Sequence, residues 1–598
     1  MTVPILEQHG NPKIGQMIIK QKKMKRFHII LLLSVVTVPF FGTMASDELH
    51  ERMYVQTDKR LYLAGEQILM KLFTVDAAQI PLAFSKVGYV ELVRDTVAQV
   101  QIKVALNGGT GEGRMKLPAD LPSGYYRLVA YTQYMRNESP DVFFEKYVGV
   151  INTFSPDHFP ESQETHTENA ASNKKGHALE HVSLELDKTA YSMREHGELL
   201  LSGLPQNIHT LSVSIAGKDL IVIPDTEDAF PLVKKSDSHS GHDTGKFLPE
   251  YEGHIITGKI VDSKTGKTGD DNDLLTPAVT FPGEGIRFFG GQKSGEGKLR
   301  FITSGIYDTD EIATVVYNAQ GKWRIDVESP FIARFESKPT PELYVDSTLF
   351  DRLLARSVAL QVFHYFSNDS IDSQNHEASS FRKNPSLSYL LDDYTRFPTM
   401  EEVFTEFIYN TRFRNRNGKQ ELSVVVNKNN NLSHSSNVVV LLDGVPVSDH
   451  STIYNYDPLK VEKINVHFGP LFMGSIEYDG IIELTTYRRL HEDLNLDKST
   501  QIIPYDGPQS SRKTHTPDYS VEENRQSRKP DVRHTLLWQP DVQTDGRTSI
   551  RIPFNTSDLA GEFQATVEGI TQDGKIIHAT LIFEVKPLSS EKIPFISI

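Results

Sequence analysis

The sequence predicts a mainly β protein, made of tandem antiparallel β-sandwiches together with one small α/β domain. Short segments that alternate apolar and polar residues recur along most of the chain. Turn signals separate them roughly every 8 to 12 residues, as in antiparallel sandwiches. Two segments near the middle carry a helical period instead. The 598 residues are enough for about four domains of roughly 150 residues each.

The N-terminus has the pattern of a signal peptide. A basic stretch at residues 22–26 precedes the apolar run 27–38, and small residues occupy the −3 and −1 positions of a cut after Ala45. The run is shorter than the roughly 20 residues that span a bilayer comfortably. We therefore expect export after cleavage, with an uncleaved anchor as the alternative. The start codon, at Met1 or at Met24, stays open.

Composition excludes several classes of function. The chain has no cysteine, which excludes disulfides, thiolate metal sites, cysteine nucleophiles and a lipobox cysteine. Acidic residues outnumber basic ones, 78 to 63, and the formal charge is −15. Because nucleic acids select basic surfaces, we expect no nucleic-acid partner.

Residues 47–153 predict the first sandwich. Turns are expected at 57–59 and at 64–66, and Tyr126, Leu128 and Ala130 share one face of the last long strand. The segments "YVQTDKRLYLAGEQILMKLFTVDA" and "LPSGYYRLVAYTQYMRN" resemble the second macroglobulin-type domain of exported bacterial proteins related to alpha-2-macroglobulin. That resemblance implies a sandwich of seven strands over about 100 residues.

A second copy of this module is expected after a polar linker at 154–178. "LELDKTAYSMREHGEL" has the layout of the first module, with Asp187-Lys188 in the place of Asp58-Lys59. Gly197-Glu198 takes the place of Gly65-Glu66 in this alignment. The second copy carries a long loop, and we assign it residues 179–250.

Residues 251–345 resemble the carboxypeptidase regulatory-like sandwich, a non-catalytic module. Its first hairpin has the pattern G-x-V-x-D-x-x-T-G, which Gly258, Asp262 and Thr265-Gly266 match in place, with Val261 one position after the Val of the pattern. The loop that follows, "TGDDNDLLTPAVTFPGEG", departs from that family.

Residues 346–490 predict a helix followed by an α/β domain. The first helix spans 346–366 with Asp346 or Ser347 as its cap, and a second begins at Thr399 with Glu402 completing a capping box. Residues from about 385 to 490 resemble the plug domain of TonB-dependent receptors, on the matches "TMEEVF", "VVVLLDGVPVSD", "DPLKVEKINVHFGP" and "DGIIELTTY".

Too few residues follow Thr486 for a receptor-sized barrel, so we expect a plug-like module without one. Residues 491–533 are polar and rich in proline, and predict a linker. Residues 534–590 are rich in predicted strands and resemble a macroglobulin-type segment through Trp538, Pro540 and "TSDLAGEFQATVEGIT".

Several motifs have both a possible functional role and a simpler structural one. His239, His242 and Asp243 could hold zinc or copper if their loop folded around it. Residues 225–251 or 155–176 could serve as a protease bait. Other motifs were Gly108–Gly113, as a phosphate loop, and the acidic pairs Asp270-Asp271 and Asp392-Asp393, for calcium. Solvated loops and a hairpin explain them better, and we expect no catalytic, cofactor-binding or metal-binding residue.

The expected function is that of a non-enzymatic, exported binding or scaffold protein of the Gram-negative envelope, in the periplasm or at the outer membrane. Its partner would be an envelope protein, with an outer-membrane barrel as one candidate. Exposed edge strands of the sandwiches could accept a partner strand. Two alternatives remain: an accessory component of TonB-dependent uptake, and a protease-interacting macroglobulin-like protein without a thioester.

Overall fold

The computed structural model describes residues 49–155, 179–221, 223–224, 247–269, 275–283, 285–294, 297–319, 321–366, 384–428, 431–473, 476–489, 494–512 and 516–587. Contacts divide the chain into Met1–Glu48 and Leu49–Ile598, and all elements below belong to the second unit. The expected signal peptide, residues 1–45, and nearly all of the linker 154–178 lie outside the described residues. Among the described residues, no helix has the length and apolar character needed to cross a membrane.

The first module is a sandwich of two sheets around one apolar core. One sheet has the order β1 (Arg52–Thr57), β3 (Gln67–Val75), β6 (Thr110–Lys116). The other has the order β2 (Leu61–Leu63), β8 (Phe144–Ile151), β7 (Gly124–Tyr131), β4 (Val87–Arg94), β5 (Val97–Ala105). Two short 3-10 helices, η1 (Tyr134–Asn137) and η2 (Pro140–Val142), join β7 to β8.

Strand β7 is buried more completely than a half-exposed strand would be. Tyr126, Leu128 and Ala130 lie in the core as predicted, but Val129 between them is also buried. Val129 pairs in register with Glu91, which accepts a hydrogen bond from the Ile332 backbone N–H at 3.3 Å. A segment from the middle of the chain therefore covers the outer face of this sheet, which a local alternation pattern cannot indicate.

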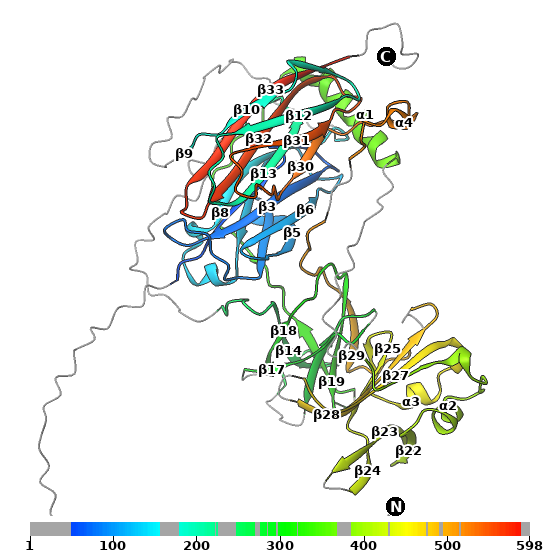
Figure 1. Cartoon of the computed structure of the whole chain (residues 1–598). Helices are drawn as coiled ribbons and strands as arrows, with labels where there is room; N and C mark the ends of the chain where they lie inside the picture. Colours follow the sequence, from blue (N-terminus) through cyan, green and yellow to red (C-terminus); the bar gives the residue numbers. More distant parts are fainter. Residues whose placement is uncertain are drawn as a thin grey trace, which may run out of the picture. The chain divides into compact units, whose positions relative to one another are not determined.

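The second sandwich repeats the topology of the first, strand for strand. Its sheets have the orders β10-β12-β31 and β11-β33-β32-β13-β30, where the first module has β1-β3-β6 and β2-β8-β7-β4-β5. Figure 1 shows the teal strands β12 and β13 among the orange and red strands β30 to β33. The strands are β10 (Ser183–Leu186), β11 (Ala190–Ser192), β12 (His196–Ser202), β13 (Ile208–Gly217), β30 (Thr535–Gln539), β31 (Ser549–Asn555), β32 (Gly561–Thr571) and β33 (Ile576–Lys586), with β9 (Leu179–Glu180) beside β33.

This arrangement corrects the expected domain organisation. Residues 179–250 and 534–590 were expected to form two separate modules, yet strands from both segments build the same two sheets. In the first module, β4 and β5 are joined by a tight hairpin at Arg94–Val97. In the second, residues 218–534 are inserted between the equivalent strands β13 and β30.

The repeat is preserved at the level of hydrogen bonds. Asp58 accepts a bond from the Tyr62 hydroxyl at 2.8 Å, and Asp187 accepts one from the Tyr191 hydroxyl at 2.6 Å. Asp58 also accepts the backbone N–H of Leu69 in β3 at 3.2 Å, and Asp187 accepts that of Glu198 in β12 at 2.8 Å.

The strand registers also correct the sequence alignment of the two copies. Thr57 pairs with Met70 where Leu186 pairs with Leu199, so the two turns have the same length. Glu195, rather than Glu198, therefore occupies the place of Glu66. Arg194 takes the place of Gly65, and both adopt a positive φ, +52° and +91°.

The insert begins with a third sandwich. One sheet has the order β17-β18-β14-β20 and the other β16-β15-β19-β29. The last strand lies within 491–533, so the expectation of a linker there is wrong for Thr500–Pro504, which completes a sheet with β19. The strands are β14 (His254–Asp262), β15 (Thr276–Thr280), β16 (Phe288–Gly290), β17 (Gln292–Lys293), β18 (Lys298–Thr303), β19 (Glu311–Tyr317), β20 (Trp323–Val327) and β29 (Thr500–Pro504).

The α/β module follows within the insert. Its main sheet has the order β21-β27-β28-β25-β26, with β25 parallel to β28, and a smaller sheet has the order β22-β23-β24. The elements are β21 (Leu387–Leu390), η4 (Leu391–Asp393), α2 (Met400–Glu406), β22 (Thr411–Arg416), β23 (Lys419–Lys428), β24 (Asn431–Ser435), β25 (Val438–Leu442), β26 (Val445–Pro446), α3 (Ser451–Tyr454), η5 (Pro458–Lys460), β27 (Val461–Met473) and β28 (Ile476–Thr486).

Local signals in this module form as predicted. The Thr399 side chain caps α2 by accepting the backbone N–H of Glu402 at 3.3 Å, and it donates to the Glu402 carboxylate at 2.9 Å. Asp443 and Gly444 adopt φ values of +50° and +81°, as a tight hairpin turn between β25 and β26 requires. Thr486 fixes this turn by donating its backbone N–H and its hydroxyl to Asp443 at 2.8 and 2.6 Å.

Helix α1 (Phe350–Phe366) forms where predicted but packs elsewhere. Residues 346–490 were expected to be one unit, whereas α1 contacts the first sandwich. The Arg356 guanidinium donates to both carboxylate oxygens of Glu66 at 3.0 and 2.9 Å, and Ser357 bonds Thr153 at 2.7 Å. The 3-10 turn η3 (Ser347–Leu349) precedes α1, and α4 (Glu522–Arg525) lies near the end of the insert.

Candidate functional site

The insert sandwich and the α/β module share an apolar core. Strand β25 is buried on both faces: Val438, Val440 and Leu442 contact the α/β core, while Val439 and Leu441 contact residues of β15 and β19. This explains the unbroken apolar run of β25, because a strand buried on both sides has no polar alternation.

The turn after β25 is part of the same contact. The Gly283 N–H donates to the Asp443 carbonyl at 3.1 Å. A Cβ added at Gly444 would lie 3.0 Å from the Gly283 nitrogen and from the Pro282 Cα. Glycine is therefore required there both for its positive φ and for the close backbone approach.

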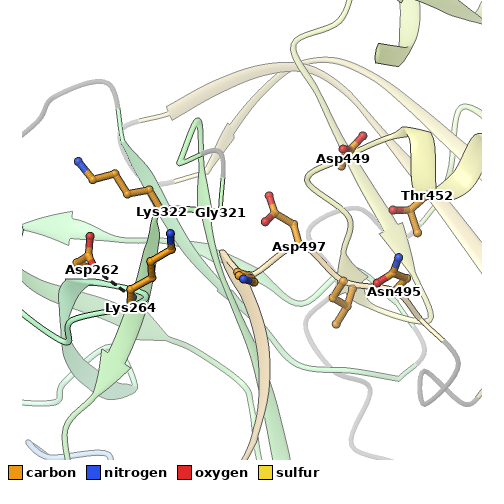
Figure 2. Close-up of a pocket in the computed structure, with 10 residues that line it drawn as sticks. Asp262, Lys264, Gly321, Lys322, Asp449, Thr452, Asn495 and Asp497 are labelled. Atoms are coloured by element: carbon orange, nitrogen blue, oxygen red, sulfur yellow. Dashed lines mark hydrogen bonds between the residues drawn. The ribbon is translucent and has the colours of Figure 1, made fainter. Parts of the chain in front are cut away.

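A polar cavity of about 690 Å³ lies between residues of the insert sandwich and residues of the α/β module, and we call it the seam cavity. Figure 2 shows Asp497 between side chains of the sandwich and side chains of the α/β module. The connecting segment 495–498 supplies the remaining wall. The lining residues are Asp262, Lys264, Gly321, Lys322, Asp449, Thr452, Asn495, Leu496, Asp497 and Lys498.

The three carboxylates in the lining already have protein partners, and Asp497 accepts the backbone N–H of Ser499 at 3.4 Å. Asp262 accepts the backbone N–H groups of Thr265 and Lys264 at 2.8 and 3.0 Å, and these bonds lower its pKa. Burial alone would raise the pKa of Asp449, but bonds from Ser451 and the charge of Lys419, 3.4 Å away, lower it. The side chains of Asp262 and Asp449 therefore stay ionised near neutral pH and order the local backbone.

The lysines that line the cavity differ from its carboxylates in their contacts. Within the described ranges, Lys264, Lys322 and Lys498 form no ion pair with a carboxylate, although Lys322 lies 4.7 Å from the Trp323 ring centre. Together with the Asn495 amide they offer hydrogen-bond donors to a polar ligand. No group of three potential metal ligands occurs in the part of the chain that the structure describes.

The sequence-based candidate sites have separate outcomes. His239, His242 and Asp243, Asp270-Asp271, and nearly all of the two bait-like loops lie outside the described residues. Gly108–Gly113 covers a tight turn and the start of β6, as the hairpin interpretation predicted. Asp392 accepts hydrogen bonds from Arg396 and from the Tyr487 hydroxyl, so it links η4 to the residue that follows β28.

Sequence reasoning missed a buried ionic cluster at the corner of the first sandwich. Lys59 lies 3.1 Å from Asp58 and 3.4 Å from Glu66, which also binds Arg356 of α1. Thr535 of the second sandwich donates to Asp58 at 2.7 Å. Burial alone would raise the pKa of Glu66, but the neighbouring cations outweigh it and lower the pKa to about 2.

A second buried cluster joins the first sandwich to the insert. The Tyr89 hydroxyl donates to Glu250 at 3.0 Å, and His254 lies 2.8 Å from the same carboxylate. His254 also contacts the Tyr505 hydroxyl, and the Lys103 ammonium lies 3.8 Å from the Tyr505 ring centre. Burial lowers the pKa of Lys103 to about 8. These polar groups link residues of the first sandwich to residues of the insert.

Comparison with known proteins gave distant similarities only. No family model matches the chain, and no curated protein matches it significantly. Salmonella alpha-2-macroglobulin reacted with methylamine is 9% identical with a TM-score of 0.23, and Escherichia coli alpha-2-macroglobulin in its native conformation is 10% identical with a TM-score of 0.22. Each alignment covers 90% of this chain, which spans only 39% and 40% of those proteins.

The Escherichia coli adhesin FdeC is 11% identical, with a TM-score of 0.15 over 47% of this chain and 65% of its own. At these scores the similarities carry no conclusion about function. The mainly β sandwich architecture follows from the strand order described above.

Proposed function

We propose that the chain is a non-enzymatic binding or scaffold protein of the Gram-negative envelope, in which two repeated sandwiches carry an insert that presents the binding surface. The insertion of residues 218–534 into a hairpin position of the second sandwich carries this proposal. The sandwich keeps the strand order of the first copy despite the insertion. The repeat therefore supplies a stable base, and the insert supplies the variable part.

The contacts between modules support a scaffold of fixed geometry. The corner of the first sandwich binds Thr535 and Arg356, and its outer sheet face binds Ile332 and Glu250. Buried charged contacts depend on geometry more than apolar contacts do, because a displaced charge would be left without its partner. The seam cavity, with polar groups from both insert modules, is the binding site that we favour.

Site-specific photocrosslinking tests this proposal. A photoreactive phenylalanine analogue at Lys322 or Thr452 would lie in the seam cavity, and the same analogue at Arg547, an exposed residue of the second sandwich, is the matched control. We expect a discrete envelope adduct from the cavity positions and none from Arg547. Identical adduct patterns at all three positions would contradict the proposal.

An accessory role in TonB-dependent uptake is a second candidate. It is supported by the plug-like module, whose capped helix, tight turn and short helix before β27 all form where the resemblance requires them. Co-purification of the chain with an outer-membrane receptor, lost when residues 384–489 are deleted, is the expected result. Retention of the receptor by the deletion variant would exclude this role.

A protease-interacting role rests on the sequence resemblance alone. It predicts that limited proteolysis cuts within 225–251 or 155–176 and that the protease is then retained. Release of the protease after cleavage would exclude this role.

A further inference from the structure

Strand β22 carries a row of arginines on one face. Arg412, Arg414 and Arg416 alternate with Phe413, which packs against the α/β core, so the three guanidinium groups lie on the opposite face. All three side chains are exposed. The chain as a whole has a formal charge of −15, so this basic row is contrary to its overall charge.

The Glu421 carboxylate lies on the same face as the arginines, because Glu421 pairs in register with Arg414 on the neighbouring strand. Arg416 lies 3.9 Å from Glu421, whereas Arg412 and Arg414 have no ion pair among the described residues. His434 lies on the same face, beside Ser423, which pairs in register with Arg412. Burial and the charges of Arg412 and Arg414 lower the pKa of His434, so it adds no charge near neutral pH.

Strand β22 is also the edge of its sheet. The order is β22-β23-β24, and no described strand pairs with the outer side of β22. Its hairpin to β23 is held by Asn417 and Gly418, with φ values of +52° and +81°, as a two-residue turn requires. The edge therefore offers backbone hydrogen-bonding groups beside an ordered row of positive charges.

We propose that β22 binds an extended acidic segment of a partner protein, which adds as a further strand beside Arg412, Arg414 and Arg416. Residues two apart on a strand are roughly 6.6 to 6.8 Å apart, so carboxylates at alternate positions of the incoming strand meet the three arginines in register. The backbone edge favours a polypeptide over other polyanions, since only a polypeptide continues the ladder. This inference goes beyond the proposed function and uses arginines that do not line the seam cavity.

Binding of labelled peptides to the full chain tests this inference. One peptide alternates Glu and Thr, and the other has the same composition with its Glu residues contiguous. Fluorescence anisotropy should give about tenfold tighter binding for the alternating peptide, and hydrogen exchange should show protection of Thr411–Arg416. Equal affinities, or an absence of protection in β22, would overturn the inference.

Matched variants separate the site from general electrostatics. Arg412→Gln with Arg414→Gln should weaken binding about tenfold, whereas Arg547→Gln with Arg551→Gln, which removes the same charge from the second sandwich, should leave it unchanged. Equal effects of the two pairs would contradict strand addition, and so would equal protection of β22 by inorganic polyphosphate. In either case the arginines would serve only to keep the edge soluble.

Discussion

Replacing Glu66 by Gln should destabilise the corner of the first sandwich strongly. The Glu66 carboxylate is 8% exposed, and it binds Arg356 in bidentate geometry at 3.0 and 2.9 Å with Lys59 at 3.4 Å. The Glu66→Gln variant leaves the buried Arg356 guanidinium without its carboxylate, whereas Lys59 keeps Asp58 at 3.1 Å. Breaking a buried ion pair by removing one partner costs about 3–5 kcal/mol.

The pKa of Glu66 gives an independent magnitude. Its fall from 4.5 to about 2 corresponds to about 3 kcal/mol at roughly 1.4 kcal/mol per pH unit. Because the folded-state pKa is depressed, this stability is complete above the unfolded-state pKa and is lost as the pH falls toward 2. The wild-type corner should therefore weaken between about pH 4.5 and pH 2, and the Glu66→Gln variant should lack that dependence.

The repeat supplies a matched control. Glu195 occupies the same position in the second sandwich, but its side chain is 25% exposed and pairs with Lys188, which is 41% exposed, at 2.7 Å. Glu195→Gln should cost only about 0–1 kcal/mol. Hydrogen exchange of β2 and β3 as a function of denaturant measures the Glu66 effect, and that of β11 and β12 measures the Glu195 effect. Similar costs for the two variants would show that burial does not determine the strength of these ion pairs.

Three further predictions follow from single contacts. Gly444→Ala should lower the free energy of unfolding by about 1–3 kcal/mol more than Gly418→Ala. Both glycines have a φ of +81°, but only Gly444 has backbone atoms within 4 Å of the added Cβ. Thermal unfolding measures the difference, and equal losses would contradict this prediction. Burial lowers the pKa of Lys146 to about 7, so unfolding at higher pH takes up a proton. The free energy of unfolding of the wild type should therefore rise by roughly 2–3 kcal/mol between pH 7.5 and 9.5, relative to that of Lys146→Met. Parallel pH profiles of the two proteins in denaturant titrations would exclude this effect. Thr399→Ala should cost about 1 kcal/mol through loss of the α2 cap, and exchange rates in α2 that do not change would show that the cap contributes nothing.

Local features were predictable from the sequence because neighbouring residues determine them. The Thr399 cap, the turn at Asp443-Gly444 and the helix ending at Phe366 each depend on residues a few positions apart. The periodicity of α1 indicated an apolar face but could not identify its partner, which is the corner around Glu66, far away in sequence.

Features that depend on distant pairing were not predictable in this way. Strand β29 lies in a polar, proline-rich stretch, and its membership of a sheet depends on β19. The second sandwich is completed by strands that follow the insert, and most chain connections are shorter than this one. The sequence alignment of Glu198 with Glu66 followed the Gly-Glu letters, whereas the structure keeps the turn length and places Arg194 at the positive φ.

The seam cavity combines both kinds of feature. Asp262 belongs to a hairpin that the sequence predicted, while Asn495 and Asp497 come from a segment expected to be a linker. Only the packing of β25 against the insert sandwich brings them together, and the apolar run of β25 gave no indication of its second partner.

The shared second sandwich is tested most directly by one engineered disulfide. Leu200 and Arg551 are register partners on β12 and β31, and directly opposed residues of an antiparallel pair have Cα atoms roughly 4.5 to 5.5 Å apart, within the range of a disulfide. The chain has no cysteine of its own, so Leu200→Cys with Arg551→Cys can form one intramolecular bond. If β12 and β31 share one sheet, this bond forms readily under mild oxidation, while Leu200→Cys with Arg414→Cys stays reduced. Equal oxidation of the two double variants, or a Leu200→Cys, Arg551→Cys variant that stays reduced, would contradict this shared sheet.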